Sequence, residues 1–192
     1  MDELTYTHNP ASLDSILRDT AELGFDMGSD PRTGALLRTL AASKPGGRFL
    51  ELGTGTGIAT AWILGGMDKS AELISVDLDG RVQEIARAHL GSDPRLKFVI
   101  EDGLEFLRRQ PHGSFDFVFA DAMPGKYEGL DEALRVLKPG GIYIVDDMLP
   151  QPNWPEGHAP KIPVLIEALS RTADLSVVPL AWATGLVIAV RA

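Results

Sequence analysis

The chain has 192 residues, of which 44% are hydrophobic and 23% charged, the size and composition of one soluble globular domain. Its formal net charge of −9 argues against a nucleic-acid partner, which would need Lys and Arg facing phosphates, and the absence of cysteine excludes disulfides and thiolate chemistry. No apolar run is long enough to cross a membrane, and the first residues, M-D-E-L-T-Y, lack a signal-peptide pattern, so we expect a cytoplasmic protein without a membrane partner.

Two helices are predicted before the first strand. Apolar residues at helical spacing predict a helix over residues 12–23, which ends at Gly24. Asp30 is expected as the N-cap of a second helix, with Pro31 at its first position, and this helix runs to about residue 43. The Lys-Pro-Gly-Gly sequence at 44–47 then predicts a turn.

The stretch R-F-L-E-L-G-T-G-T-G at 48–57 organises the rest of the chain. It predicts a buried strand, a glycine turn and a helix that starts near Thr56. We expect Gly53, Gly55 and Gly57 to adopt positive φ and to let a ligand approach the backbone at Thr54. The positive end of the helix dipole favours an anionic group there.

Two classes of cofactor use such a turn. The dinucleotide fingerprint G-x-G-x-x-G fits poorly, because the third glycine comes one place early and Ile58 stands where glycine or alanine is required. Glu51 precedes the first glycine and can pair with a ligand ammonium while the loop amides hold a carboxylate. The methionine end of S-adenosylmethionine (SAM) carries both groups. Any other α/β nucleotide-binding turn with an incidental glutamate is the alternative.

Strands and helices alternate through the remaining sequence. Strands are predicted at 72–77, 96–100, 115–120 and 141–146, helices at 56–64, 80–90, 104–109, 127–137 and 162–169, and a closing hairpin at 175–179 and 185–190. The alternation predicts one α/β domain with a mostly parallel sheet and helices on both faces. A second Lys-Pro-Gly-Gly at 138–141 predicts the same turn as the first, and residues 150–163 contain five prolines with Trp154 and His158, a candidate functional loop.

Acidic residues follow several predicted strands at the edge where ligands bind in open α/β sheets. Asp77, with Leu78 beside it, suits the ribose hydroxyls of SAM or of NAD, and its alternative role is a helix N-cap. Asp102, with Gly103 beside it, suits the adenine amino group, and its alternative is a surface loop carboxylate.

A second acidic group comes from two neighbouring strands. Asp121 follows the strand at 115–120, and Asp146 and Asp147 close the strand at 141–146. Three like charges at one edge favour a hard divalent cation such as Mg²⁺, which prefers oxygen ligands and acidifies a bound hydroxyl. The alternative is a set of carboxylates that surround a cationic sulfonium.

Several segments together resemble the class I SAM-dependent methyltransferases, in particular the cation-dependent small-molecule O-methyltransferases of the catechol and caffeoyl-CoA type. The segments are M-G-S-D-P-R-T-G at 27–34, E-L-G-T-G-T-G at 51–57, S-V-D at 75–77 and T-G-L-V-I-A-V-R at 184–191. The resemblance implies a Rossmann-like sheet of seven strands with an antiparallel last strand, N-terminal helices over 1–44 and a core over 45–192. It also implies that Met27 lines the SAM pocket and that Asp121, Asp146 and Asp147 are metal ligands.

Three departures from that family stand out. Its third metal ligand is usually Asn, where this chain has Asp147, and its general-base lysine would fall at Pro124. Lys126, two residues later, is therefore our leading candidate for the base, with His158 behind it and a solvated surface lysine as the alternative. Gly55 replaces the aromatic or polar residue that the family often has inside the glycine motif.

These patterns predict a SAM-dependent enzyme that methylates an oxygen of a small hydroxylated, for example aromatic, acceptor with help from Mg²⁺ or another divalent cation. Asp121 and Lys126 are the predicted catalytic residues. The alternatives are a metal-independent N- or O-methyltransferase, a NAD-dependent oxidoreductase and a non-catalytic SAM-binding protein. The sequence leaves the oligomeric state open, with a homodimer as one option.

Overall fold

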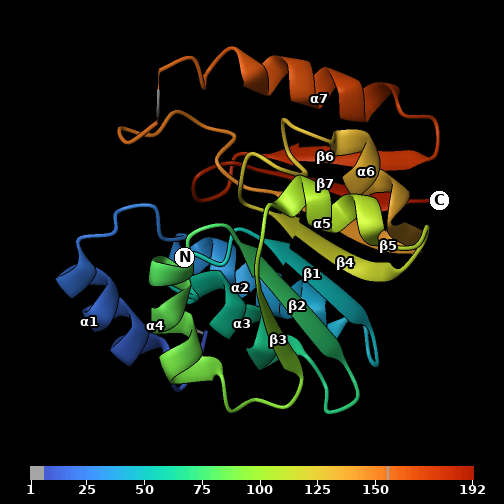
Figure 1. Cartoon of the computed structure of the whole chain (residues 1–192). Coiled ribbons are helices and arrows are strands. Elements are labelled where there is room, and N and C mark those ends of the chain that lie inside the picture. The colour runs from blue at the N-terminus through green and yellow to red at the C-terminus, as the bar shows by residue number, and fades with distance from the viewer. Residues whose placement is uncertain (1–6, 155) are drawn as a thin grey trace.

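The computed structural model describes residues 7–154 and 156–192 (Figure 1). The N-terminal segment M-D-E-L-T-Y, on which the prediction of no signal peptide depends, lies outside these ranges. The helices are α1 (Leu13–Leu23), α2 (Pro31–Ala42), α3 (Ile58–Gly66), α4 (Gly80–Leu90), α5 (Gly103–Arg109), α6 (Leu130–Arg135) and α7 (Lys161–Arg171). The strands are β1 (Arg48–Leu52), β2 (Glu72–Asp77), β3 (Leu96–Ile100), β4 (Phe115–Ala120), β5 (Leu137–Val145), β6 (Leu175–Leu180) and β7 (Leu186–Arg191).

The seven strands of the described residues form one sheet, in the order β3-β2-β1-β4-β5-β7-β6. The first five pair in parallel, whereas β7 pairs antiparallel with both β5 and β6. The predicted mostly parallel sheet with an antiparallel last strand is therefore confirmed. After β1 the chain adds β2 and β3 on one side of this strand and then β4 and β5 on its other side, so the switch point lies between β1 and β4. Open α/β sheets bind ligands at the carboxyl end of such a switch point.

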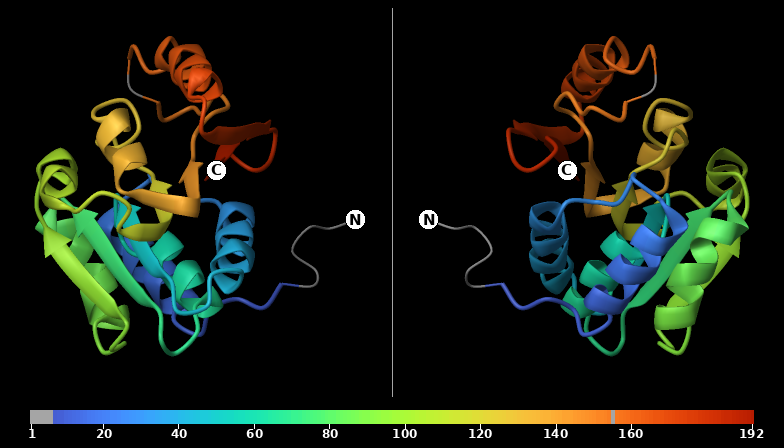
Figure 2. Two further views of the ribbon diagram at one scale, coloured as in Figure 1. Left: turned by 90° about the vertical axis from the view of Figure 1, so that its right-hand side faces the viewer. Right: turned by 90° about the vertical axis from the view of Figure 1, so that its left-hand side faces the viewer.

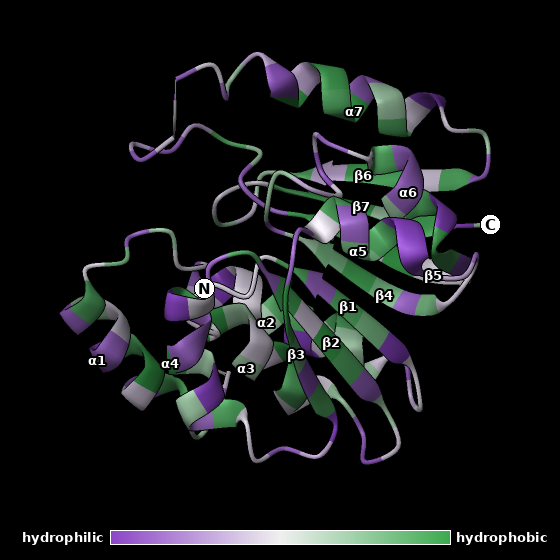
Figure 3. Cartoon of the chain, viewed as in Figure 1, coloured by the Kyte–Doolittle hydropathy of each residue, from purple (hydrophilic) through white to green (hydrophobic). Residues whose placement is uncertain are grey.

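Helices cover both faces of the sheet, as predicted. One core contains residues of α1, α2, α3 and α4, with Trp62 and Phe117 fully buried at its centre. The other contains residues of α5, α6 and α7, with Phe115 and Tyr143 fully buried. Figures 1 and 2 show α7 lying over the β6–β7 side of the sheet, and Figure 3 shows apolar residues along the central strands. Each face of the sheet is thus shielded from water, which the near-continuous apolar strands require.

Local signals at the helix ends are largely confirmed. Gly24 caps α1 with φ +71°, and the Asp30 side chain accepts a hydrogen bond from the Arg32 N–H at 2.7 Å at the start of α2. The helix after the glycine turn begins at Ile58, two residues later than predicted, because Gly57 adopts φ +91° and serves as its N-cap.

Two predictions on the later half of the chain are wrong in detail. The predicted helix at 127–137 is shorter, since α6 begins only after Gly129, which has φ +70°. The second Lys-Pro-Gly-Gly does not repeat the turn of the first, but belongs to β5. It bulges from the β4 ladder, because Phe115 pairs with Leu137 while Phe117 already pairs with Ile142.

Among the residues described, no helix is both long and apolar enough to cross a bilayer.

Candidate active site

A cavity of about 810 Å³ lies at the carboxyl edge of the sheet, above the switch point at β1. This volume is in the range of small-molecule and cofactor sites. Its walls come from the α1–α2 connection, the glycine turn and the loops after β2, β3 and β4. The predicted cofactor residues that line it are Met27, Gly53, Thr54, Gly55, Asp77, Leu78, Asp102, Gly103 and Asp121.

The glycine turn folds as predicted. Gly53, Gly55 and Gly57 have φ of +96°, +53° and +91°. A Cβ on Gly53 would lie 2.6 Å from the backbone oxygen of Asp121, so glycine is required for the close contact between β1 and β4 ends. All three glycine N–H groups already donate within the protein: to the Val76 carbonyl, the Asp77 carboxylate and the Thr54 carbonyl, respectively. In this arrangement the three glycine N–H groups already have acceptors, and the predicted contact between the loop amides and a ligand carboxylate stays a prediction.

Glu51 does not line the cavity. Its side chain is fully buried, and its Oε2 accepts hydrogen bonds from Thr60 at 2.6 Å and Ser75 at 2.5 Å. Its other oxygen, Oε1, has no partner among the described residues. Burial raises the pKa of Glu51 to about 7, against the two hydroxyl bonds, which lower it. The contact predicted between Glu51 and a ligand ammonium stays a prediction; the unpartnered oxygen is the atom available for it.

The carboxylate of Asp77 stands at the cavity wall and shapes the turn. Its Oδ2 accepts from the Gly55 N–H at 2.8 Å, and its Oδ1 accepts from the Asp79 N–H at 2.9 Å. Asp79, not Asp77, is the N-cap of α4, so the alternative role considered for Asp77 is wrong. Asp102 is itself a helix N-cap, since its Oδ1 accepts from the N–H groups of Leu104 and Glu105 at the start of α5.

The connection between α1 and α2 forms one side of the cavity. Met27 exposes 64% of its surface and lines the cavity, and its role in a SAM pocket stays a prediction. Two contacts that the sequence did not reveal hold this segment in place. The Ser29 hydroxyl donates to Asp121 Oδ2 at 3.2 Å, and the Asn153 side chain donates to the Asp26 carbonyl at 2.9 Å. The segment before α2 is therefore tied both to the end of β4 and to the proline-rich loop.

The three predicted metal-ligand carboxylates come near one another but do not converge. Burial raises the pKa of Asp121 well above its ordinary value, and repulsion from Asp146 and Asp147 adds to the rise. Burial likewise raises the pKa of Asp146 to about 6. Asp146 Oδ1 accepts from the Asp147 N–H at 2.7 Å and from the Thr184 hydroxyl. Within residues 7–154 and 156–192, no three Asp, Glu, His or Cys side chains are grouped so that they could hold a metal ion.

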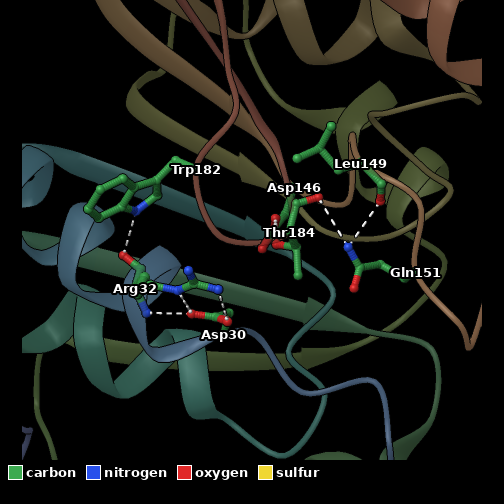
Figure 4. Close-up of polar contacts among 7 residues, drawn as sticks. All are labelled: Asp30, Arg32, Asp146, Leu149, Gln151, Trp182 and Thr184. Atoms are coloured by element: carbon green, nitrogen blue, oxygen red, sulfur yellow. Dashed lines mark hydrogen bonds and ion pairs between the residues drawn. The ribbon is translucent and has the colours of Figure 1, made fainter. Parts of the chain in front are cut away.

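The hairpin between β6 and β7 supplies the Thr184 contact (Figure 4). Gln151 Nε2, from the proline-rich loop, donates to the Leu149 carbonyl at 3.0 Å and to the Thr184 carbonyl at 3.5 Å. Figure 4 also shows Trp182 of the same turn donating from Nε1 to the Arg32 carbonyl, at 3.1 Å. The end of β5 is thus fixed by a segment from the C-terminal part of the chain, which no sequence motif signalled.

Lys126 is buried, with 3% exposure, so the alternative of a solvated lysine is wrong. Its Nζ donates to the backbone carbonyl of Asp146 at 2.5 Å. Burial lowers the pKa of the Lys126 ammonium, and the three nearby carboxylates, Asp121 most strongly, oppose that change. Lys126 does not line the cavity. Its predicted role as general base stays a prediction.

The two aromatic residues singled out in the proline-rich loop pack together behind Lys126. The rings of Trp154 and His158 stack at 4.5 Å, and His158 Nε2 lies 3.1 Å from the Tyr127 hydroxyl. Burial lowers the pKa of His158, and the nearby Lys126 ammonium lowers it further. These contacts make His158 the anchor of the loop; like Lys126, it stays outside the cavity wall.

Comparisons with known proteins agree with this fold and site. The family model described as "Methyltransferase domain" matches residues 49–141. A protein of Mycobacterium ulcerans named "Putative O-methyltransferase" is 33% identical over 153 residues, covering 74% of this chain and 68% of its own. One of the same name from Mycolicibacterium vanbaalenii is 31% identical over 150 residues, covering 74% and 66%. The chain spans about two thirds of the length of these relatives.

A solved structure extends the likeness to nearly the whole chain. The crystal structure of the O-methyltransferase from Bacillus cereus, in complex with S-adenosylhomocysteine (SAH), matches with a TM-score of 0.84 at 20% identity. The match covers 98% of this chain and 94% of that one. At this identity the likeness concerns the fold alone.

A sheet of this strand order, with a glycine turn at its switch point and a cavity above it, is typical of α/β proteins that bind their ligands at the carboxyl edge of the sheet. With the similarity to the mycobacterial proteins, the chain belongs to the class I SAM-dependent methyltransferases.

Proposed function

We propose that the protein transfers the methyl group of SAM to the oxygen of a small hydroxylated acceptor, with hydroxylated aromatic compounds as the first class to test. The observation that carries the proposal is the cavity, which runs from the glycine turn and Asp77 to Asp121. The mycobacterial relatives are named as O-methyltransferases, and these names support the choice of oxygen as the acceptor atom. The SAH complex of the Bacillus cereus enzyme supports the same cofactor here. The cytoplasmic location and the homodimer remain predictions of the sequence.

The cofactor's two ends would meet different parts of the cavity wall. The first turn of α3 offers N–H groups without intrahelical partners, and its residues Ile58 and Ala59 line the cavity, so we place the methionine carboxylate there. The ammonium would approach the unpartnered oxygen of Glu51. Asp77 would accept from the ribose hydroxyls, and Asp102 stands where the adenine amino group would reach it. This placement aims the sulfonium toward Asp121.

Transfer needs the acceptor oxygen, the methyl carbon and the sulfur in line, with about 3 Å between the reacting atoms. The oxygen–carbon bond forms as the carbon–sulfur bond breaks, and sulfur keeps the electron pair. The hydroxyl proton must go to a base. We assign that role to the Asp121 carboxylate because it lines the cavity, whereas Lys126 does not. Ser29, which donates to Asp121 Oδ2, would orient that carboxylate.

The cation assistance that the resemblance implied stays a prediction of the sequence and is no part of this proposal. A divalent ion at Asp121, Asp146 and Asp147 would acidify the hydroxyl, but the carboxylates as arranged do not offer three converging ligands.

An acceptor screen tests the proposal. Purified protein with SAM carrying a labelled methyl group is incubated with catechols, other hydroxylated aromatics and matched amines, and products are identified by mass spectrometry. We expect label on oxygen, with SAH released in equal amount. Asp121→Asn should lose turnover while it keeps SAH binding, and Asp116→Asn, on β4 away from the cavity, is the matched control. Label on amines alone, or SAH binding with no transfer to any acceptor, would contradict the proposal.

A further inference from the structure

The burial of Lys126 needs an explanation that its predicted role as a base does not give. An ammonium taken out of water is costly unless opposite charges and hydrogen-bond acceptors replace the water. Here one acceptor is the Asp146 carbonyl, at 2.5 Å from Nζ, and the carboxylates of Asp121, Asp146 and Asp147 all act on the ammonium. The lysine is thus the positive charge inside a group of three carboxyl groups.

The backbone before Lys126 is built to turn its side chain inward. The N–H groups of Lys126, Tyr127 and Glu128 all donate to the Met123 carbonyl, at 3.3, 3.0 and 3.0 Å. Gly125 has φ +79°, and a Cβ there would lie 2.3 Å from a Leu52 side-chain carbon. This tight turn brings a residue five positions after Asp121 into the carboxylate group. Pro124 stands where the family usually has its lysine and carries no charge, so Lys126 supplies the positive charge instead.

The carboxylate oxygens themselves are partly committed to protein donors. Thr184 and the Asp147 N–H both donate to Asp146 Oδ1, and Ser29 donates to Asp121 Oδ2. A small hard cation needs several oxygens converging on one point, and no three acidic or imidazole groups in the described ranges do so. This arrangement of carboxylates, with hydroxyl groups that donate to them, suits one ammonium group better than a metal ion.

We propose that the ammonium of Lys126 is the resident cation of this carboxylate group, in the place of the divalent ion that the resemblance predicts, and that the protein binds no metal there. Lys126 is then a positioning residue: it holds the ends of β4 and β5 together and balances the charge of Asp147, the residue that stands where the family usually has asparagine. The inference takes its meaning from the proposed function, but its test does not depend on turnover.

Metal binding is measured directly, with Mn²⁺ as the probe. The electron paramagnetic resonance signal of free Mn²⁺ is recorded during titration with the full chain, and the melting temperature is measured with EDTA, Mg²⁺ or Mn²⁺. For the wild type we expect no stoichiometric loss of the free Mn²⁺ signal. Its melting temperature should be the same in EDTA, in Mg²⁺ and in Mn²⁺. Lys126→Met removes the ammonium that holds this arrangement, so the carboxylates can turn toward one another and toward a metal ion. The variant should then gain Mn²⁺ binding, with a rise in melting temperature of about 5 to 10 °C at saturating metal.

Lys97→Met is the matched control, because it removes the same charge from an exposed position on β3. It should respond to metal as the wild type does. Stoichiometric Mn²⁺ binding by the wild type would overturn the inference, and so would a folded Lys126→Met that gains no Mn²⁺ binding. If Lys126→Met does not fold, the wild-type titration decides alone. SAH binding, measured in the same samples, separates this outcome from failure of the proposed function: metal binding with SAH binding intact contradicts only the role of Lys126.

Discussion

Glu51 makes a prediction about stability that can be worked out from its surroundings. The carboxyl group is fully buried, and burial raises its pKa from the usual value near 4.5 to about 7. Between those two pH values the folded protein holds a proton that the unfolded chain has lost. The contribution of Glu51 to the free energy of unfolding therefore falls as the pH rises, and it stays low above pH 7.

The substitution Glu51→Gln removes this dependence. At 1.36 kcal/mol per pKa unit, the wild type should lose about 2 kcal/mol relative to the variant between pH 5.5 and pH 8. At the acid end the variant gains nothing, because Thr60 and Ser75 already donate to the carboxyl oxygen that the amide oxygen would replace. The amide NH₂ would take the place of Oε1, which has no partner among the described residues, so a small cost there is expected.

The assay is urea unfolding followed by far-UV circular dichroism at several pH values, with Glu72→Gln, an exposed site on β2, as the control for the loss of a carboxyl group. Glu72→Gln should follow the wild type. If the curves of stability against pH for wild type and Glu51→Gln run parallel, the burial of Glu51 does not act as argued. With SAH added, a ligand ammonium at Oε1 should favour the charged carboxylate, so wild-type affinity should rise with pH more steeply than that of Glu51→Gln.

Three further predictions concern the cavity. Gly53→Ala should destabilise the protein by about 2 kcal/mol or more in urea unfolding, because φ is +96° and the Cβ meets a carbonyl oxygen at 2.6 Å; Gly113→Ala, with φ +59° and open space, should cost only the backbone strain, about 1 kcal/mol. Equal losses would contradict the role of close packing. Asn153→Ala removes the hydrogen bond to the Asp26 carbonyl, so it should weaken SAH binding by about 3- to 10-fold in calorimetry and speed hydrogen exchange over residues 24–29. Unchanged exchange would show that Asn153 does not hold this segment in place. Asp77→Ala should weaken SAH binding at least about tenfold, and unchanged affinity would remove its ribose role.

The parts of the structure that local patterns govern could be predicted. The glycine turn, the Asp30 cap and the alternation of strands and helices depend on neighbours in sequence, and each was found where expected apart from small shifts at the ends. The second Lys-Pro-Gly-Gly was misjudged because the same four residues meet a neighbouring strand, β4, and tertiary pairing drew them into the sheet.

The sequence could place several acidic residues on one cavity, but not the contacts that these residues make. Strand ends in a parallel sheet lie at one edge, so Asp77, Asp102 and Asp121 could be placed on one cavity from sequence alone. Contacts between distant segments carry no local signal: Ser29 with Asp121, Asn153 with Asp26 and Thr184 with Asp146. Those contacts decide which carboxylate oxygens remain free, and thus whether the acidic group suits a metal.

The most direct test of the central claim, that SAM binds across the carboxyl edge of the sheet, is calorimetry of the full chain with SAH and, separately, with NAD. We expect one SAH to bind per chain, with affinity lowered in Asp77→Ala, and no heat from NAD. Binding of NAD without binding of SAH would show that the cavity holds a dinucleotide and would contradict the claim.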